Sequence, residues 1–410
     1  MNIDTMRNID HYAGVPLTFL GTIIKKSIEF FNPPKNIKPK NVLLIELSEM
    51  GSAIIVDPAM RKLKGEIEKE DGELFFVIFS KNKVSLQLLG TVKEQNIFAI
   101  DESSIISLAK SSLDFLKWCR ENEIDSVIDL ELFSRFTALL TASCGAVNCV
   151  GFHSFHNEGL YRGDFLTKKV SYNPHQHIAK NFISLVDALL SQKDELPYTK
   201  RVIGDDEIVI AKATISDDEK QSVLGVISNL YDGFDKDKNP IILVNSNASD
   251  LLPQRRWERE NYGDVIKLIL QENQDAIILL TGAPAEYDGA QLLCKYVSDE
   301  RCINFAGAIK FLQLPALYCL SHFMLTNDSG PAHFASITDM HTFVIFGPET
   351  PALYSSLGPT TPIYSHMACS PCVSASNHRK TPCIDNQCIK IITPEWVFNT
   401  LKPKLDELKS

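Results

Sequence analysis

The sequence lacks a long apolar run. A helix that crosses a bilayer needs about 20 mostly apolar residues, and no run of about 18 or more consecutive apolar residues occurs in this chain. The first residues, MNIDTMRNIDHYAG, carry acidic side chains and have neither the apolar core nor the cleavage site of a secretory signal. These absences predict a cytoplasmic protein without a membrane-spanning helix.

The chain is also short of positive charge. It has 41 Lys and Arg residues against 51 Asp and Glu residues, which gives a net charge of −10. A nucleic-acid-binding protein needs a basic face to meet the phosphate backbone. We therefore expect no nucleic-acid partner, while a local basic patch for a phosphorylated small ligand stays compatible with this charge.

Three common phosphate or nucleophile motifs are missing. The sequence contains no GxGxxG dinucleotide fingerprint, no GxxxxGK[ST] loop and no GxSxG elbow. Ligand-binding loops must therefore be located from the order of strands and helices.

That order indicates an α/β protein. Apolar runs typical of buried parallel strands alternate with helical spacing, such as the helices expected at 53–64 and 105–121. Such series form parallel sheets covered by helices. The chain length favours two domains, and the pattern predicts two Rossmann-like domains whose parallel sheets face one another across a cleft. The expected strands are 41–47, 74–79, 96–100 and 126–131, then 240–246, 276–282, 302–307, 323–328 and 342–347.

A charged, Pro-containing stretch at 191–206 is the expected linker. We expect an N-terminal extension at 1–40, an acceptor domain at 41–195, a donor-binding domain at 205–392 and a C-terminal helix at 393–410. Within the extension, residues 15–31 are the most membrane-like segment, interrupted by Lys25, Lys26 and Glu29. They indicate either a helix packed on the protein body or a peripheral helix resting on an anionic membrane.

The segment LTNDSGPAHFASI, 325–337, is the sharpest local signal. A strand is expected to end at Asp328, and Pro331 suits the first turn of the following helix. The amides of Ser329, Gly330 and Ala332 would then be free to bind a diphosphate, aided by the helix dipole. The alternative is that Asp328 or Ser329 only caps the helix. His333 would donate to a phosphate oxygen or serve as a structural residue.

Three other loops carry polar candidates. Arg255 and Arg256 follow an expected strand, and guanidinium groups suit phosphate because they donate two hydrogen bonds at once. Glu286 opens a helix, where it either favours the dipole or accepts hydrogen bonds from a ribose diol. In the first half, Glu49 and Ser52 lie at a strand-to-helix turn whose glycine lets a ligand approach the backbone closely.

These segments resemble glycosyltransferase family 9, the lipopolysaccharide heptosyltransferases and their relatives, which have the two-domain GT-B fold. The resemblance covers roughly residues 12–397, and DSGPAHFAS with IFGPETP is its most specific part. It implies inverting, metal-independent transfer from a nucleotide-diphosphate sugar to a glycolipid or oligosaccharide acceptor, such as a lipopolysaccharide core. It also implies a donor site made of the residues Arg255, Glu286, Asp328, Ser329, Gly330 and His333.

One position departs from the family pattern. The family's heptosyltransferases carry Asp directly after the glycine of the first loop, as the general base, and this chain has Ser52 there. A hydroxyl cannot take the acceptor proton unaided. We expect Glu49 of the same loop to replace it, since Asp57 lies further along the helix. The alternatives are a carboxylate from another loop, an epimerase, or a non-catalytic nucleotide-sugar-binding or scaffold protein of the same fold.

Four of the ten cysteines cluster near the C-terminus: Cys369, Cys372, Cys383 and Cys388. Their spacing admits a structural zinc site. The alternatives are reduced structural thiols or, less in keeping with the cytosol, two disulfides. No cofactor is expected for the transfer itself.

Overall fold

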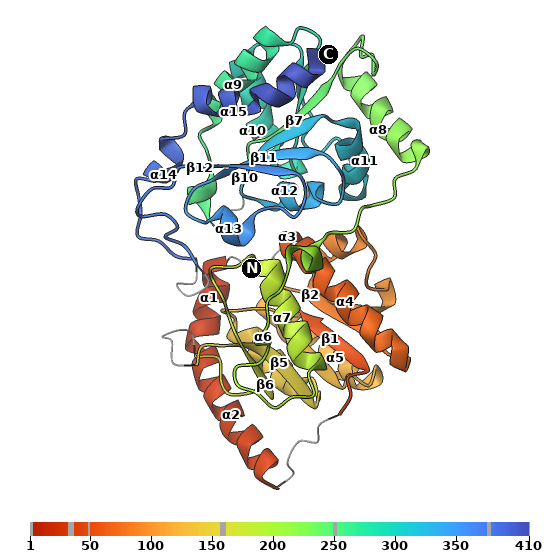
Figure 1. The fold of residues 1–410 in the computed structure, drawn as a ribbon, viewed down its shortest axis with the longest axis vertical. Coiled ribbons are helices and arrows are strands. Elements are labelled where there is room, and N and C mark those ends of the chain that lie inside the picture. The colour runs from red at the N-terminus through yellow and green to blue at the C-terminus, as the bar shows by residue number, and fades with distance from the viewer. Residues whose placement is uncertain are drawn as a thin grey trace. The chain divides into compact units, whose positions relative to one another are not determined.

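The computed structural model describes residues 3–31, 37–47, 50–155, 161–248, 252–374 and 379–409 (Figure 1). The described residues up to Val209 form one compact unit, and those from Ile210 onward form a second. Within the described residues, no helix is long and apolar enough to cross a membrane.

The first unit is built on a six-stranded parallel sheet with the strand order β3-β2-β1-β4-β5-β6. Its central strands are apolar and buried on both faces because helices cover both sides of a parallel sheet. The strands are β1 (Asn41–Ile45), β2 (Glu73–Phe79), β3 (Ile97–Ile100), β4 (Ser126–Asp129), β5 (Asn148–His153) and β6 (Lys168–Ser171). The helices are α1 (Ile3–Tyr12), α2 (Gly14–Phe31), α3 (Met50–Ile55), α4 (Asp57–Ile67), α5 (Ile105–Glu121), α6 (Arg135–Ser143) and α7 (Ile178–Leu190).

Local chemistry explains where these helices begin. Ser104 caps α5 by accepting a hydrogen bond from the Ser107 amide, and α5 has the predicted bounds. The single helix predicted at 53–64 is wrong, because the chain forms α3 and α4 instead. Pro58 lies in the first turn of α4 and has no amide to continue the hydrogen bonds of α3.

The second unit repeats the same topology. Its parallel sheet has the order β12-β11-β10-β7-β8-β9, in which the unit's first and fourth strands are neighbours, as in the first unit. The strands are β7 (Ile241–Asn245), β8 (Ile277–Leu280), β9 (Cys302–Asn304), β10 (Phe323–Asn327), β11 (His341–Phe346) and β12 (Thr360–Tyr364). The helices are α8 (Asp217–Leu230), α9 (Arg259–Glu272), α10 (Tyr287–Val297), α11 (Leu314–Leu320), α12 (Gly330–Ala335), α13 (Pro351–Tyr354), α14 (Gln387–Lys390) and α15 (Pro394–Asp406).

Both sheets have the Rossmann order, which confirms the predicted α/β class. In such sheets the order reverses between the first and fourth strands, and ligands bind beyond the carboxyl ends of the strands at that switch point. The switch points are the β1/β4 pair of the first unit and the β7/β10 pair of the second. The C-terminal helix α15 packs on α9 in the second unit.

Candidate functional site

Three charged side chains meet at the switch point of the second unit. Arg255 ends the 3-10 helix η5 (Pro253–Arg255) in the connection after β7, Asp328 directly follows β10, and Glu349 lies just beyond β11. Because β7, β10 and β11 are consecutive neighbours in the parallel sheet, their carboxyl ends bring these side chains together.

Arg255 is paired with both carboxylates. Its Nε lies 3.4 Å from Oδ2 of Asp328, and its Nη2 donates to Oε2 of Glu349. All three side chains are largely buried, with exposed fractions of 11% for Arg255, 5% for Asp328 and 1% for Glu349. Arg255 therefore pairs with two acids inside the protein, which makes it an internal partner of Asp328 as well as a candidate phosphate ligand.

A second arginine extends this cluster. The Nε of Arg379 lies 3.4 Å from Oε1 of Glu349. Its guanidinium also lies over the ring of Tyr354, 5.3 Å from the ring centroid. Two guanidinium groups and two carboxyl groups thus share one buried volume. We call Arg255, Asp328, Glu349 and Arg379 the charge cluster.

Burial sets the protonation of the acids in the charge cluster. It raises the pKa of Glu349 to about 8, although Arg255 opposes the shift, and the charge of Asp328 adds to it. Burial also raises the pKa of Asp328, against the effect of Arg255. Burial acts to lower the pKa of Arg255, but the charges of Asp328 and Glu349 outweigh it, so that pKa is raised.

The short helix α12 starts next to this cluster. Ser329 is its N-cap residue, and its hydroxyl donates to the Asn327 carbonyl, 3.2 Å away. The prediction that the Ala332 amide is free is wrong, because this amide donates to the Ser329 carbonyl in the tight first turn. Gly330 is packed closely, since a Cβ there would lie 3.0 Å from the Phe334 ring.

The other predicted donor-site residues have structural partners. His333 is buried within α12. Glu286 ends the 3-10 helix η6 (Pro284–Glu286), and its Oε2 accepts a 2.6 Å hydrogen bond from the Ala283 amide. This contact caps the turn after β8. The predicted contacts of both residues with a nucleotide stay predictions.

Asn327 links the loops at the switch point through hydrogen bonds. Its Nδ2 donates to the carbonyls of Ser246 and Asn247 after β7, and its Oδ1 accepts from the Trp257 amide. Arg256 donates to the Ala248 carbonyl from Nε and Nη2, at 3.0 and 2.7 Å. Of the predicted arginine pair, Arg256 therefore braces its own loop, while Arg255 enters the charge cluster.

In the first unit, Glu49 lies outside the described residues. Ser52 is half-buried in α3, and its carbonyl accepts from the Val56 amide. Asp57 is fully buried and bonded to Arg61 and Thr91. These contacts give Asp57 a structural role in α4.

Comparison with known proteins identifies the family of this chain. The family model described as glycosyltransferase family 9 (heptosyltransferase) matches residues 113–382, which is more than half of the chain. The chain belongs to glycosyltransferase family 9.

Lipopolysaccharide heptosyltransferase 2 of Salmonella typhimurium is 28% identical over 118 residues, 28% of this chain and 32% of that protein. Lipooligosaccharide heptosyltransferase 2 of Campylobacter jejuni is 24% identical over 185 residues, 41% of this chain and 54% of that protein. The matches thus span about a third to a half of these relatives.

Solved structures share the fold over nearly the whole chain. The E. coli ADP-heptose lipopolysaccharide heptosyltransferase II has a TM-score of 0.66 at 16% identity, covering 90% of this chain and 100% of that one. The E. coli heptosyltransferase WaaC, solved with ADP, has a TM-score of 0.58 at 15% identity, covering 89% and 99%. At these identities the likeness establishes the fold.

Sequence reasoning missed several buried charged residues of this family 9 chain. Glu349 and Arg379 had no predicted role, and neither had the acids at the first switch point. Asp129 ends β4 and is paired with Arg162. Glu131 is buried, and its Oε1 accepts from the Leu47 amide at 3.3 Å. The available signal was an acid at the end of a buried strand or within three residues of it, similar to the position of Asp328 directly after β10.

The four clustered cysteines lie in the second unit and form no disulfides. Cys369 and Cys383 are exposed, Cys372 is half-buried and Cys388 is buried. Burial, and then the neighbouring cysteines, raise the pKa of Cys388 to about 11. Among the described residues, no three His, Cys, Asp or Glu side chains are grouped to hold a metal ion. The predicted zinc ligands are thus near one another but are not arranged as a ligand set.

Proposed function

We propose that this chain is a glycosyltransferase that moves a sugar, such as a heptose, from a nucleotide-diphosphate sugar to a lipopolysaccharide-core or other cell-envelope glycan. The transfer inverts the anomeric centre and needs no metal. Membership of family 9 and the heptosyltransferase names of the relatives support the reaction class. The ADP bound to WaaC supports a nucleoside diphosphate as the leaving group.

The observation that carries this proposal is the charge cluster at the β7/β10 switch point. A diphosphate placed beyond these strands would meet repulsion from Asp328 unless that charge were neutralised. Arg255 supplies the neutralisation, and the amides of Ser329 and Gly330 at the start of α12 supply donors for the phosphate oxygens. The second unit is thus the donor-binding half.

The departing diphosphate gains negative charge in the transition state. Preoriented amides and a fixed guanidinium stabilise that charge without reorganising during the reaction. Arg255 is already held in place by two carboxylates, which keeps its position fixed before the donor binds. His333 and Glu286 complete the proposed donor site, as contacts to phosphate and ribose.

The first unit is proposed to bind the acceptor and to supply the general base. Glu49 is the first candidate because it lies in the loop after β1, at the strand edge where ligands bind. Glu131, at the adjacent end of β4, is the second candidate, since its carboxylate already reaches the backbone of the β1 loop. A carboxylate at this edge takes the proton of the acceptor hydroxyl. The proposed location is the cytoplasmic face of the membrane, with peripheral membrane contact.

Turnover by the purified full chain tests the proposal. ADP-heptose and other nucleotide sugars are offered with a heptose-deficient lipopolysaccharide core, with and without EDTA, and products are identified by mass spectrometry and anomeric NMR. We expect an inverted product, insensitive to EDTA. Glu49→Gln should lower kcat at least about a hundredfold with little change in donor KM, because general-base catalysis contributes on that order.

Glu66→Gln, which changes an exposed carboxylate of α4 in the same unit, is the matched control and should keep wild-type kcat. Nucleotide binding without sugar release from any donor would favour the non-catalytic binder. An epimerised donor formed without acceptor would replace the transferase with an epimerase.

A further inference from the structure

The helix α2 turns its polar side toward the protein. The residues that face the first unit recur every three or four positions: Gly14, Thr18, Gly21, Lys25 and Glu29. A Cβ at Gly14 would lie 2.8 Å from Arg135 of α6, and one at Gly21 would lie 3.1 Å from the Phe165 ring. Small residues therefore let α2 pack closely on the unit, and Lys25 donates to the Phe165 carbonyl at 2.6 Å.

The opposite side of α2 is apolar and exposed. Helices of soluble proteins normally bury their apolar stripe and expose their polar side, so this orientation is reversed. Ile24 is 51% exposed, Phe30 82% and Phe31 85%. The exposed apolar face of α2, called the outer face below, consists of Leu17, Phe19, Leu20, Ile23, Ile24, Ile28, Phe30 and Phe31.

Charge is absent from the outer face. The charged residues of α2 are Lys25, Lys26 and Glu29. Lys25 lies 3.8 Å from Glu29, and Lys26 lies 2.9 Å from Asp164 of the first unit, so both ammonium groups are paired at the inner side or the flank. The hydroxyl of the exposed residue Ser27 donates to the Ile23 carbonyl at 2.9 Å, so its donor has a partner within the helix.

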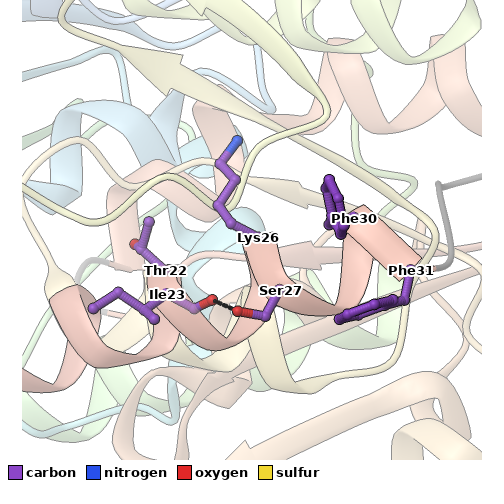
Figure 2. Close-up of a pocket in the computed structure, with 6 residues that line it drawn as sticks. All are labelled: Thr22, Ile23, Lys26, Ser27, Phe30 and Phe31. Carbon is purple, nitrogen blue, oxygen red and sulfur yellow. Dashed lines mark hydrogen bonds between the residues drawn. The ribbon is translucent and has the colours of Figure 1, made fainter.

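The end of α2 carries an open hollow with mixed chemistry. Figure 2 shows the side chains that line it: Thr22, Ile23, Lys26, Ser27, Phe30 and Phe31. Phe30 and Phe31 meet edge to face at the C-terminal end of the helix. An ammonium group beside aromatic and aliphatic surface matches the region of a bilayer where phosphate headgroups meet acyl chains.

We propose that α2 is the membrane-docking element of this protein and that its partner is a phospholipid bilayer. The helix lies in the plane of the interface, about 27 Å long, with the outer face in the acyl region. A protein partner would be expected to meet a polar rim around the apolar centre, whereas the outer face is flanked at the hollow by Lys26, whose ammonium group suits a lipid phosphate. The proposal rests on the proposed function in one respect, since a lipid-carried acceptor places the enzyme at this surface. Residues 14–31 also precede the family match, which begins at residue 113.

Vesicle flotation of the full chain tests this proposal without donor or acceptor. We expect the wild type to float with phosphatidylcholine vesicles nearly as well as with phosphatidylethanolamine–phosphatidylglycerol vesicles, because the outer face binds through apolar area. Ile24→Gln with Phe31→Gln should weaken the partition coefficient by about tenfold or more. Leu20→Gln with Ile28→Gln, a second pair on the same face, should do the same.

The matched control is Leu292→Gln with Leu312→Gln in the second unit, at positions 53% and 48% exposed. It should float like the wild type, and all variants should keep wild-type turnover on a soluble acceptor fragment. A wild type that floats with vesicles but shows no turnover would overturn the proposed function and leave the docking proposal standing. A wild type that floats with neither vesicle, or outer-face variants that float unchanged, would overturn the docking proposal. So would a dimer in sedimentation velocity that the outer-face variants dissociate.

Discussion

At the scale of single residues, the charge cluster sets the electrostatics of the candidate donor site. Asp328 and Glu349 would be two adjacent buried acids if Arg255 were absent, and removing one partner of a buried pair leaves an uncompensated charge. Arg379 reaches Glu349 from the other side. The affinity for an anionic ligand at this strand edge therefore depends on Arg255 even if its guanidinium never contacts the ligand.

Arg255→Ala is expected to weaken ADP binding by about tenfold or more, the loss typical of a charge-assisted interaction of roughly 1.5–3 kcal/mol. Isothermal calorimetry measures this directly. Arg256→Ala is the matched control because Arg256 donates to the Ala248 carbonyl of its own loop and is not part of the charge cluster. It should change the Kd little. Equal affinity of Arg255→Ala and wild type would remove Arg255 from the donor site.

The raised pKa of Glu349 predicts how the free energy of unfolding changes with pH. Its pKa is about 8 in the folded protein, against an ordinary value of 4.5. Between these values the folded chain keeps a proton that the unfolded chain has lost, so this group's contribution to stability falls as pH rises from about 4.5 to 8. Gln cannot ionise. The unfolding free energy of Glu349→Gln minus that of the wild type should therefore rise from pH 5 to pH 8.

Urea denaturation at several pH values in that window checks this expectation. Titrating groups distant from Glu349 cancel in the difference between the two proteins. Leu292→Gln, an exposed substitution that removes no titrating group, should give a difference that does not vary with pH. A Glu349→Gln difference that is equally flat would contradict the raised pKa.

At the scale of elements, the position of each candidate site residue follows from the strand that precedes its loop. Strands β7, β10 and β11 are central and fully paired, so the residues at their ends are held by the rigid sheet. The short helix α12 then starts at Ser329, where Pro331 fits the first turn. The described residues of the segment 369–388 differ, because most of them form neither helix nor strand.

The cysteines of that segment carry the structural-zinc prediction. The structural-zinc prediction implies that elemental analysis of chain purified without chelators should give about one zinc per molecule. Cys372→Ser and Cys388→Ser should each lose the metal and lower the melting temperature, whereas Cys319→Ser, outside the cluster, should lose neither. Metal-free wild-type protein with four reactive thiols would show that these cysteines are reduced structural residues.

At the scale of the whole molecule, two units repeat one topology with different chemistry at their switch points. The second unit gathers arginines with acids near the start of α12. The first pairs Asp129 with Arg162 and places a further buried acid, Glu131, near the end of β1. This further acid fits the proposal that the first unit supplies the general base.

The sequence predicted strands such as β1 and β10 well, but it did not predict β5, β6 or β12. Strands such as β1 and β10 are covered on both faces and therefore read as continuous apolar runs. Edge strands β6 and β12 contain Lys168, Lys169, Thr360 and Pro362, which an edge tolerates because one side is unpaired. Sequence reasoning did not predict them for that reason.

The sequence by itself determined the α/β class, the alternating order and the strand ends that carry Asp328 and Arg255, because burial of parallel strands leaves a periodic pattern in the chain. Only the tertiary structure decided which of those residues meet. Glu349 joins Arg255 across 94 positions of sequence separation, and α2 presents its apolar side outward. Both depend on the order of strands and on close packing between distant segments, which no local pattern of residue types records.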